Sequence, residues 1–318
     1  MGRRQALILG LIVAGVAAGA HPPDAPAIIG GRPVPAGQLR ATARVVGAGE
    51  ACTGTLVAPR HVLLALHCVA PGAALRVTVG NPNRGGLVQE RRVVDAVGAP
   101  QVDPPPSVTG QVDAAILVLD RAVSIVPATI APPAEATLAP GASAVLAGFG
   151  ATTAPPPPSL SLHSRLLEGA VQVAPCADVA AGNDESGFVG CATPVAGRVA
   201  AGSPCVGDSG GPVLAASPTL GRLVLVGVLS GGAGDSDCAP TNGSIFTTIV
   251  SLLSWINDVE AAPVPPAAKP PAGCRSQRRA LTRFRHKIAA ARSRHQRGRL
   301  RQLRRGYDHL HAAIYRNC

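Results

Sequence analysis

The most informative stretch of this chain reads Cys205-Val206-Gly207-Asp208-Ser209-Gly210-Gly211-Pro212. Its glycines favour a tight turn around the serine, because glycine adopts backbone conformations that other residues avoid. Such a turn can hold the Ser209 hydroxyl exposed and leave backbone N–H groups free to face a developing negative charge. Ser209 is therefore a candidate nucleophile, although many glycine-rich turns carry a serine that has no chemical role.

Two polar residues earlier in the chain lie beside apolar runs that suit buried strands. His67 follows an apolar segment and precedes a cysteine, and Asp113 opens the apolar run 113–119. In the order His67, Asp113, Ser209, these residues resemble the catalytic residues of the chymotrypsin/trypsin family of serine endopeptidases. The resemblance covers residues 28–260 and includes all three catalytic motifs.

Residues 28–260 read as short apolar segments separated by glycine and proline, which is typical of an all-β barrel or sandwich. The expected strands include residues 43–46, 75–79, 115–119, 144–147 and 223–229. Periodicity alone does not distinguish a barrel from a sandwich. The family resemblance implies an all-β fold of two six-stranded antiparallel β-barrels, with the active site in the cleft between them. The single helix-like segment, residues 248–259, has apolar residues at helical spacing and matches the family's C-terminal helix.

The resemblance assigns a role to each candidate site residue. Ser209 would attack the scissile carbonyl, His67 would accept its proton, and Asp113 would hold the imidazole in the productive tautomer. The backbone N–H groups of Gly207 and Ser209 would form the oxyanion hole. Ser230, in a Leu-Ser-Gly-Gly sequence, matches the serine that supports the catalytic acid.

The sequence Ile28-Ile29-Gly30-Gly31 resembles the mature N-terminus of the same family. There, the freed amino group of Ile28 would pair with the acid before the catalytic serine, which is Asp208 here. Burying two opposite charges is costly unless they pair, so the pairing can act as a zymogen switch that orders the oxyanion hole. The alternative is that this segment merely begins an edge strand.

The first residues of the chain have the pattern of an export signal. Two arginines precede the apolar run 6–20, which is short for a membrane span. We expect residues 1–20 to form a signal peptide and residues 21–27 a short propeptide, so that the mature protein has no membrane span. Signal-peptidase cleavage directly after Ala27 is one alternative, and an uncleaved anchor is another.

Eight widely spaced cysteines favour disulfides and therefore an oxidising compartment. Sequence alone does not select a pairing. The resemblance selects three pairs, and a fourth remains by exclusion: Cys52–Cys68, Cys176–Cys191, Cys205–Cys238 and, by exclusion, Cys274–Cys318.

The resemblance places the specificity pocket at three small residues, with Ser203 at its floor and Gly232 and Ser244 in its walls. Without a carboxylate at the floor, a buried Arg or Lys of the substrate would have no partner to offset its desolvation. We therefore expect cleavage after small-to-medium apolar residues and not after Arg or Lys. Two departures from the family are the bulky Leu66 before the histidine and Gly231 in place of the usual aromatic residue. We expect no metal and no cofactor.

A strongly basic segment ends the chain. Residues 269–318 carry fifteen Lys and Arg against one acid, whereas the other residues carry 14 basic and 17 acidic side chains. We expect a Pro/Ala-rich linker over residues 261–273 and a basic helical hairpin over residues 274–318. The hairpin can bind an anionic surface or polymer, dock on the protease domain, or stay solvated without a partner. Stacking aromatics are too few to predict specific nucleic-acid binding.

These observations predict a secreted or envelope-associated serine endopeptidase that acts on proteins or peptides. Residues 28–260 would form the protease domain, and we expect a monomer. The rival hypothesis is a catalytically inactive homologue that acts as a binding protein on anionic surfaces.

Overall fold

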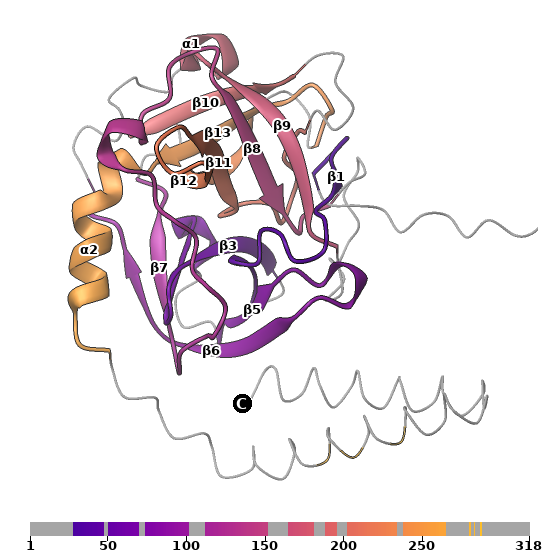
Figure 1. Ribbon diagram of the computed structural model, residues 1–318, viewed down its shortest axis with the longest axis vertical. Helices are drawn as coiled ribbons and strands as arrows, with labels where there is room; N and C mark the ends of the chain where they lie inside the picture. Colours follow the sequence, from indigo (N-terminus) through magenta and orange to yellow (C-terminus); the bar gives the residue numbers. More distant parts are fainter. Residues whose placement is uncertain are drawn as a thin grey trace, which may run out of the picture.

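The computed structural model describes residues 28–47, 50–69, 74–101, 112–151, 165–180, 188–195, 202–233 and 238–264, together with Ala280, Arg283 and Lys287. The predicted signal peptide and propeptide lie outside the described residues, as do most of the predicted linker and helical tail. The strands between residues 42 and 248 form two β-barrels, which Figure 1 shows one above the other.

The first barrel is closed by six antiparallel strands in the order β2-β3-β4-β7-β6-β5. Their bounds are β2 Thr42–Gly47, β3 Glu50–Ala58, β4 His61–Leu64, β5 Arg76–Gly80, β6 Val88–Gly98 and β7 Ala115–Leu119. Strand β7 is buried along its whole length because both of its faces are covered. Leu117 and Leu119 pack inside the barrel, whereas Ile116 faces a separate buried cluster. The uninterrupted apolar run therefore reflects burial on both faces, since alternate side chains of a strand point in opposite directions.

The second barrel has the order β8-β9-β10-β13-β12-β11 and closes because β8 pairs with both β9 and β11. Its strands are β8 Ser143–Gly148, β9 Leu167–Ala174, β10 Val189–Pro194, β11 Pro212–Ser217, β12 Arg222–Ala233 and β13 Gly243–Thr248. The two-residue strand β1, Arg32–Pro33, adds to β9. The two closed antiparallel barrels confirm the predicted fold class.

Helical segments within residues 28–264 are short. They are the α-helices α1 Cys176–Val179 and α2 Leu253–Ala261 and the 3₁₀ segments η1 Leu66–Cys68, η2 Asn83–Gly85, η3 Pro133–Glu135 and η4 Val250–Leu252. The described tail residues Ala280, Arg283 and Lys287 are also α-helical. The helix predicted from residue 248 begins later, because Thr248 still pairs with Gly227 in the sheet. The prediction of a single helical segment was wrong, since the four-residue α1 is too short to leave a periodic apolar pattern. Within the described ranges, no helix is long and apolar enough to cross a membrane.

Packing of α2 joins the two barrels. Trp255 lies in one buried cluster with Ile116 of β7 and Leu225 of β12, and Figure 1 shows α2 alongside β7. Thr247 of β13 donates a hydrogen bond of 3.2 Å to the backbone oxygen of Asp113, just before β7. These contacts hold the Asp113 segment of the first barrel against the second barrel.

Candidate active site

The predicted base and its carboxylate meet because their strands are neighbours. His67 lies in η1 after β4, and Asp113 lies just before β7. Strands β4 and β7 pair antiparallel, with Leu64 opposite Ala115. His67 Nδ1 lies 2.7 Å from Asp113 Oδ2, and the backbone N–H of His67 donates to Asp113 Oδ1 at 3.0 Å. One carboxylate therefore orients both the ring and the main chain of His67.

The residue before His67 fits despite its size. Leu66 packs against the core of the first barrel, beside Gly98 of β6. A Cβ atom on Gly98 would lie 3.3 Å from Leu66 Cδ1, so the missing side chain leaves the space that Leu66 fills. The bulky residue at this position is thus accommodated locally.

Asp113 keeps its negative charge although it is buried. Burial alone would raise the pKa of Asp113, but a hydrogen bond and charge from His67, with a hydrogen bond from Ser230, hold it below its ordinary value. The hydrogen bond to Asp113 in turn raises the pKa of His67, against the opposing effect of partial burial. An ionised carboxylate beside an imidazole stabilises the imidazolium form, as a general base requires.

Ser209 lies in a turn that packs against the first barrel. Its backbone oxygen accepts a hydrogen bond of 2.9 Å from Thr53 N on β3, and lies 3.8 Å from Sγ of Cys68, the neighbour of His67. The next residue, Gly210, has a φ of +83°, and a Cβ atom there would lie 2.3 Å from Thr53 O. Only glycine fits this approach. The turn thus brings the half-buried Ser209 to the barrel junction that holds His67.

The predicted activation residues are in contact. Asp208 is fully buried, and its carboxylate accepts hydrogen bonds from Gly150 N at 2.8 Å, from Cys205 N at 3.0 Å and from the backbone N–H of Ile28. Burial outweighs these hydrogen bonds and raises the pKa of Asp208 to about 7. Ile28 is also completely buried, with a φ of 57° that is rare for a β-branched residue.

Two glycines next to Asp208 are functional candidates that the sequence did not reveal. A Cβ atom on Gly148 would lie 2.1 Å from Asp208 Oδ1, and one on Gly150 would lie 2.5 Å from Asp208 Cγ. Both positions must therefore lack a side chain if the Asp208 carboxylate is to occupy its site. The Gly-Phe-Gly sequence is the available signal, but nothing in it points to a partner 58 residues away.

The predicted pocket residues lie on neighbouring segments. Gly232 of β12 is opposite Ser244 of β13, and the Ser203 hydroxyl lies 2.8 Å from Ala239 O and 2.9 Å from Asn242 O. Ser203 and Ser244 are completely buried, whereas Gly232 is exposed. Since a hydroxyl group has a single proton, Ser203 directs it to backbone carbonyls rather than to a ligand.

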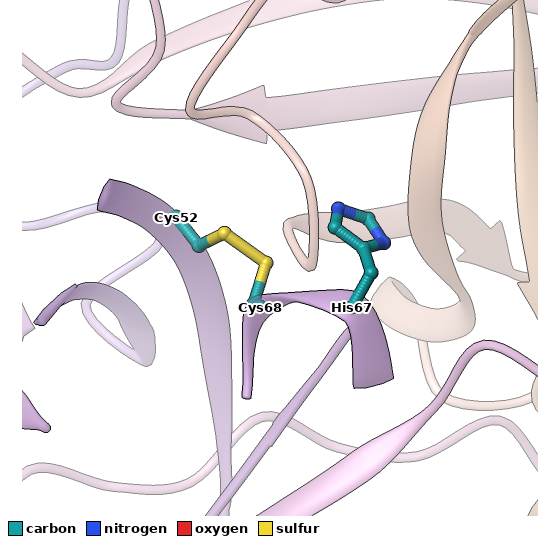
Figure 2. Close-up of side chains that lie close together, drawn as sticks. All are labelled: Cys52, His67 and Cys68. Carbon is teal, nitrogen blue, oxygen red and sulfur yellow. A yellow bond between two sulfur atoms is a disulfide. The ribbon is translucent and has the colours of Figure 1, made fainter. Parts of the chain in front are cut away.

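Three of the predicted disulfides are confirmed: Cys52–Cys68, Cys176–Cys191 and Cys205–Cys238. The fourth predicted pair, Cys274–Cys318, lies outside the described residues. Figure 2 shows the first disulfide joining β3 to the η1 turn, with the His67 ring beside it.

The group Cys52, His67 and Cys68 resembles a metal-ligand cluster in its spacing, because one ligand atom of each lies within 4.8 Å of the others. Both sulfur atoms are consumed in the disulfide, and His67 Nδ1 faces Asp113. Metal binding by cysteine requires a thiolate. This group therefore does not fit a metal site.

Comparison with known proteins agrees with the fold. The model of the family described as Trypsin matches residues 28–256. Transmembrane protease serine 5 of Homo sapiens is 30% identical over 252 residues, which cover 74% of this chain and 52% of that protein. Trypsin 5G1 of Aedes aegypti is 28% identical, and the match covers 73% of this chain and 84% of that protein. Glucanase inhibitor protein 2 of Phytophthora infestans is 27% identical, and the match covers 73% of this chain and 88% of that protein.

The chain thus spans about half the length of the human protease that it matches. The family match nevertheless covers most of the chain and coincides with the two closed barrels. The chain belongs to the trypsin family.

Proposed function

We propose that this protein is a serine endopeptidase in which Ser209 is the nucleophile, His67 the general base and Asp113 the supporting carboxylate. The contact between His67 Nδ1 and Asp113 Oδ2 at 2.7 Å is the observation that carries the proposal. The Asp113 carboxylate also accepts a hydrogen bond from Ser230, which orients it and, after the larger effect of His67, lowers its pKa. This arrangement can hold an imidazole in one tautomer with its other nitrogen directed away from Asp113.

The reaction proceeds by acyl transfer. Ser209 Oγ attacks the scissile carbonyl carbon while His67 removes the hydroxyl proton, and the carbonyl oxygen becomes an oxyanion. The N–H groups of Gly207 and Ser209 stabilise that charge. His67 then gives the proton to the leaving amine, and a water molecule, activated by the same histidine, releases the acyl group from Ser209.

Activation follows from the burial of Asp208. Cleavage after Ala27 would turn the Ile28 amide, which already donates to Asp208, into a positively charged amino group. A buried carboxylate with a raised pKa is costly to ionise alone but pairs favourably with a cation in contact. The pairing would stabilise the segment that contains Gly207 and Ser209, so cleavage acts as the switch from a zymogen.

We propose cleavage after small-to-medium apolar residues. The Ser203 hydroxyl faces two backbone carbonyls, and Ser203 and Ser244 carry no charge. A substrate Arg or Lys would find no carboxylate at either position to offset its desolvation. We also propose export to an oxidising compartment, which the three disulfides support, and attachment of the monomeric protein to an anionic surface through its basic tail.

A non-catalytic binding protein is the second candidate. The Phytophthora relatives are named as inhibitors of a glucanase rather than as proteases. A protein of that kind can keep the barrels and disulfides without reacting chemically at its serine.

Labelling with a fluorophosphonate separates the two candidates, because only an activated serine reacts rapidly. We expect the processed protein with a free Ile28 amino group to be labelled at Ser209, and the Ser209→Ala variant to stay unlabelled. N-terminal sequencing of the same sample verifies processing. A processed wild-type protein that is not labelled would overturn the protease proposal in favour of the binding protein.

A further inference from the structure

We infer that the Thr53 hydroxyl group is a positioning group for the oxyanion loop, residues 205–209. This inference rests on the proposed protease function. Thr53 belongs to β3 of the first barrel, whereas the loop precedes β11 of the second. Its side chain is completely buried. Thr53 Oγ1 donates a hydrogen bond of 2.8 Å to Gly207 O and accepts one of 3.0 Å from Phe149 N.

The two partners fix the role of the Thr53 hydroxyl. Gly207 O can only accept a hydrogen bond and Phe149 N–H can only donate one, so the hydroxyl proton must point at Gly207. Thr53 N also donates to Ser209 O at 2.9 Å. One residue thus contacts the main chain of both residues that carry the proposed oxyanion donors.

Orientation of Gly207 is the property that these contacts control. Gly207 has a φ of +94° and, as a glycine, has access to many other backbone conformations. Its N–H belongs to the peptide plane that contains Val206 O, and Ala151 N holds that oxygen at 2.8 Å. Since the N–H and C=O of a trans peptide point in opposite directions, this contact directs the Gly207 N–H. Thr53 holds the following peptide plane through Gly207 O, and the N–H of Asp208 in the same plane donates to Cys205 O at 3.0 Å.

The two contacts differ in what they require of the sequence. A backbone donor such as Ala151 N is available from any residue except proline. The contact to Gly207 O comes from a side chain, so it depends on the hydroxyl group of Thr53. We therefore assign the side-chain part of this control to Thr53.

Thr53 also couples the loop to the segment around the buried acid. Three consecutive N–H groups, those of Phe149, Gly150 and Ala151, donate to Thr53 Oγ1, Asp208 Oδ1 and Val206 O respectively. The hydroxyl is the point at which β3, this segment and the loop meet. Loss of the hydroxyl would leave the buried Phe149 N–H and Gly207 O without this partner. Among the described residues, the peptide between Gly207 and Asp208 would then be held only by the hydrogen bond from Asp208 N to Cys205 O, so its orientation would be less constrained.

The test compares Thr53→Val, which keeps the shape but removes the hydroxyl, with Thr53→Ser, which keeps the hydroxyl. We expect Thr53→Val to lower kcat about 10- to 100-fold with KM changed less than about twofold, below the effect of deleting an oxyanion donor. A peptide boronate, which forms a tetrahedral adduct, should bind correspondingly more weakly. Thr53→Ser should recover most of both losses. Thr55→Val, at a buried threonine on the same strand, is the matched control for general loss of stability.

A Thr53→Val protein with wild-type kcat would overturn the inference, and so would an equal loss in Thr55→Val. If Thr53→Val does not fold, Thr53→Ala and Thr53→Ser replace it as a pair, because both lack the methyl group and they differ only in the hydroxyl. Equal kcat in that pair would also overturn it. An inactive, correctly processed wild-type protein would refute the protease proposal itself, so the two failures are distinguishable.

Discussion

Ser230 Oγ donates a hydrogen bond of 2.5 Å to Asp113 Oδ2, the oxygen that also faces His67 Nδ1. Ser230 belongs to β12 of the second barrel, whereas Asp113 and His67 flank strands of the first. The orientation of the imidazole therefore depends on contacts from both barrels. A change in how the barrels meet would alter the base as well as the nucleophile.

Replacement of Asp113 by asparagine tests the carboxylate. The amide cannot stabilise an imidazolium and favours the wrong tautomer of His67, so we expect kcat to fall about 10⁴-fold. Because Asp113 raises the pKa of His67 and the base must be neutral, the acidic limb of the kcat/KM profile should move to lower pH. Steady-state rates across the pH range measure both effects. An unshifted acidic limb would show that a group other than His67 controls that limb. Ser230→Ala, which keeps the Asp113 carboxylate, should lower kcat less than Asp113→Asn does.

The stability of the uncleaved chain should depend on pH through Asp208. Its folded pKa of about 7 exceeds the ordinary value of 3.8, so the folded protein binds the proton more tightly than the unfolded one. The stability that this proton provides is present at low pH and is lost as the pH rises from about 4 through about 7, with a slope of up to about 1.4 kcal/mol per pH unit.

Thermal unfolding of uncleaved Ser209→Ala at pH 5 and pH 8 measures this dependence, since the substitution prevents self-processing. The double variant with Asp208→Asn should lose most of the difference between the two pH values. After cleavage before Ile28, the new ammonium group should stabilise the ionised carboxylate and reduce the loss at pH 8. A pH dependence that survives Asp208→Asn would assign it to other groups.

Family motifs predicted the two barrels, three disulfides and the cluster of His67 and Asp113, because each depends on short sequence signals with fixed spacing. Strand β7 was predictable to the residue because an apolar run buried on both faces leaves a clear pattern. Helix α1 was missed because a single turn has no period. The role of Thr53 was hidden for a different reason: it depends on partners about 100 to 150 residues away in the chain, and a buried threonine on a strand is common.

Gly150→Ala tests whether the Asp208 carboxylate requires the absence of a side chain at residue 150. The new methyl group would lie 2.5 Å from Asp208 Cγ, so the carboxylate or the segment must shift. We expect the free energy of unfolding to fall by about 1–3 kcal/mol, as in an overpacked core, and activity to fall with it. Denaturant unfolding measures the first effect. Gly231→Ala is the matched control, because a Cβ atom there meets nothing within 4 Å; equal losses in both variants would contradict the steric explanation.

An aromatic residue at Gly231 should extend substrate recognition. The position is half-buried on β12, has open space for a side chain and follows Ser230 directly. We expect Gly231→Phe to lower KM for peptides with several residues before the scissile bond, by about threefold to tenfold, because the ring adds apolar contact area. KM for a substrate with one residue before the bond should stay unchanged. An equal change for both substrates would place the effect at the primary pocket instead.

Removal of the basic tail tests its proposed partner. Truncation after Val264 keeps α2 intact and removes all fifteen basic residues of the segment 269–318. We expect the processed full chain to be retained on an anionic polymer at low salt and released as salt rises, because screening weakens contacts between exposed charges. The truncated protein should elute without retention and keep wild-type kcat on a short peptide. Equal retention of both proteins would locate the anionic contact on the barrels, and no retention of the full chain would favour a tail without such a partner.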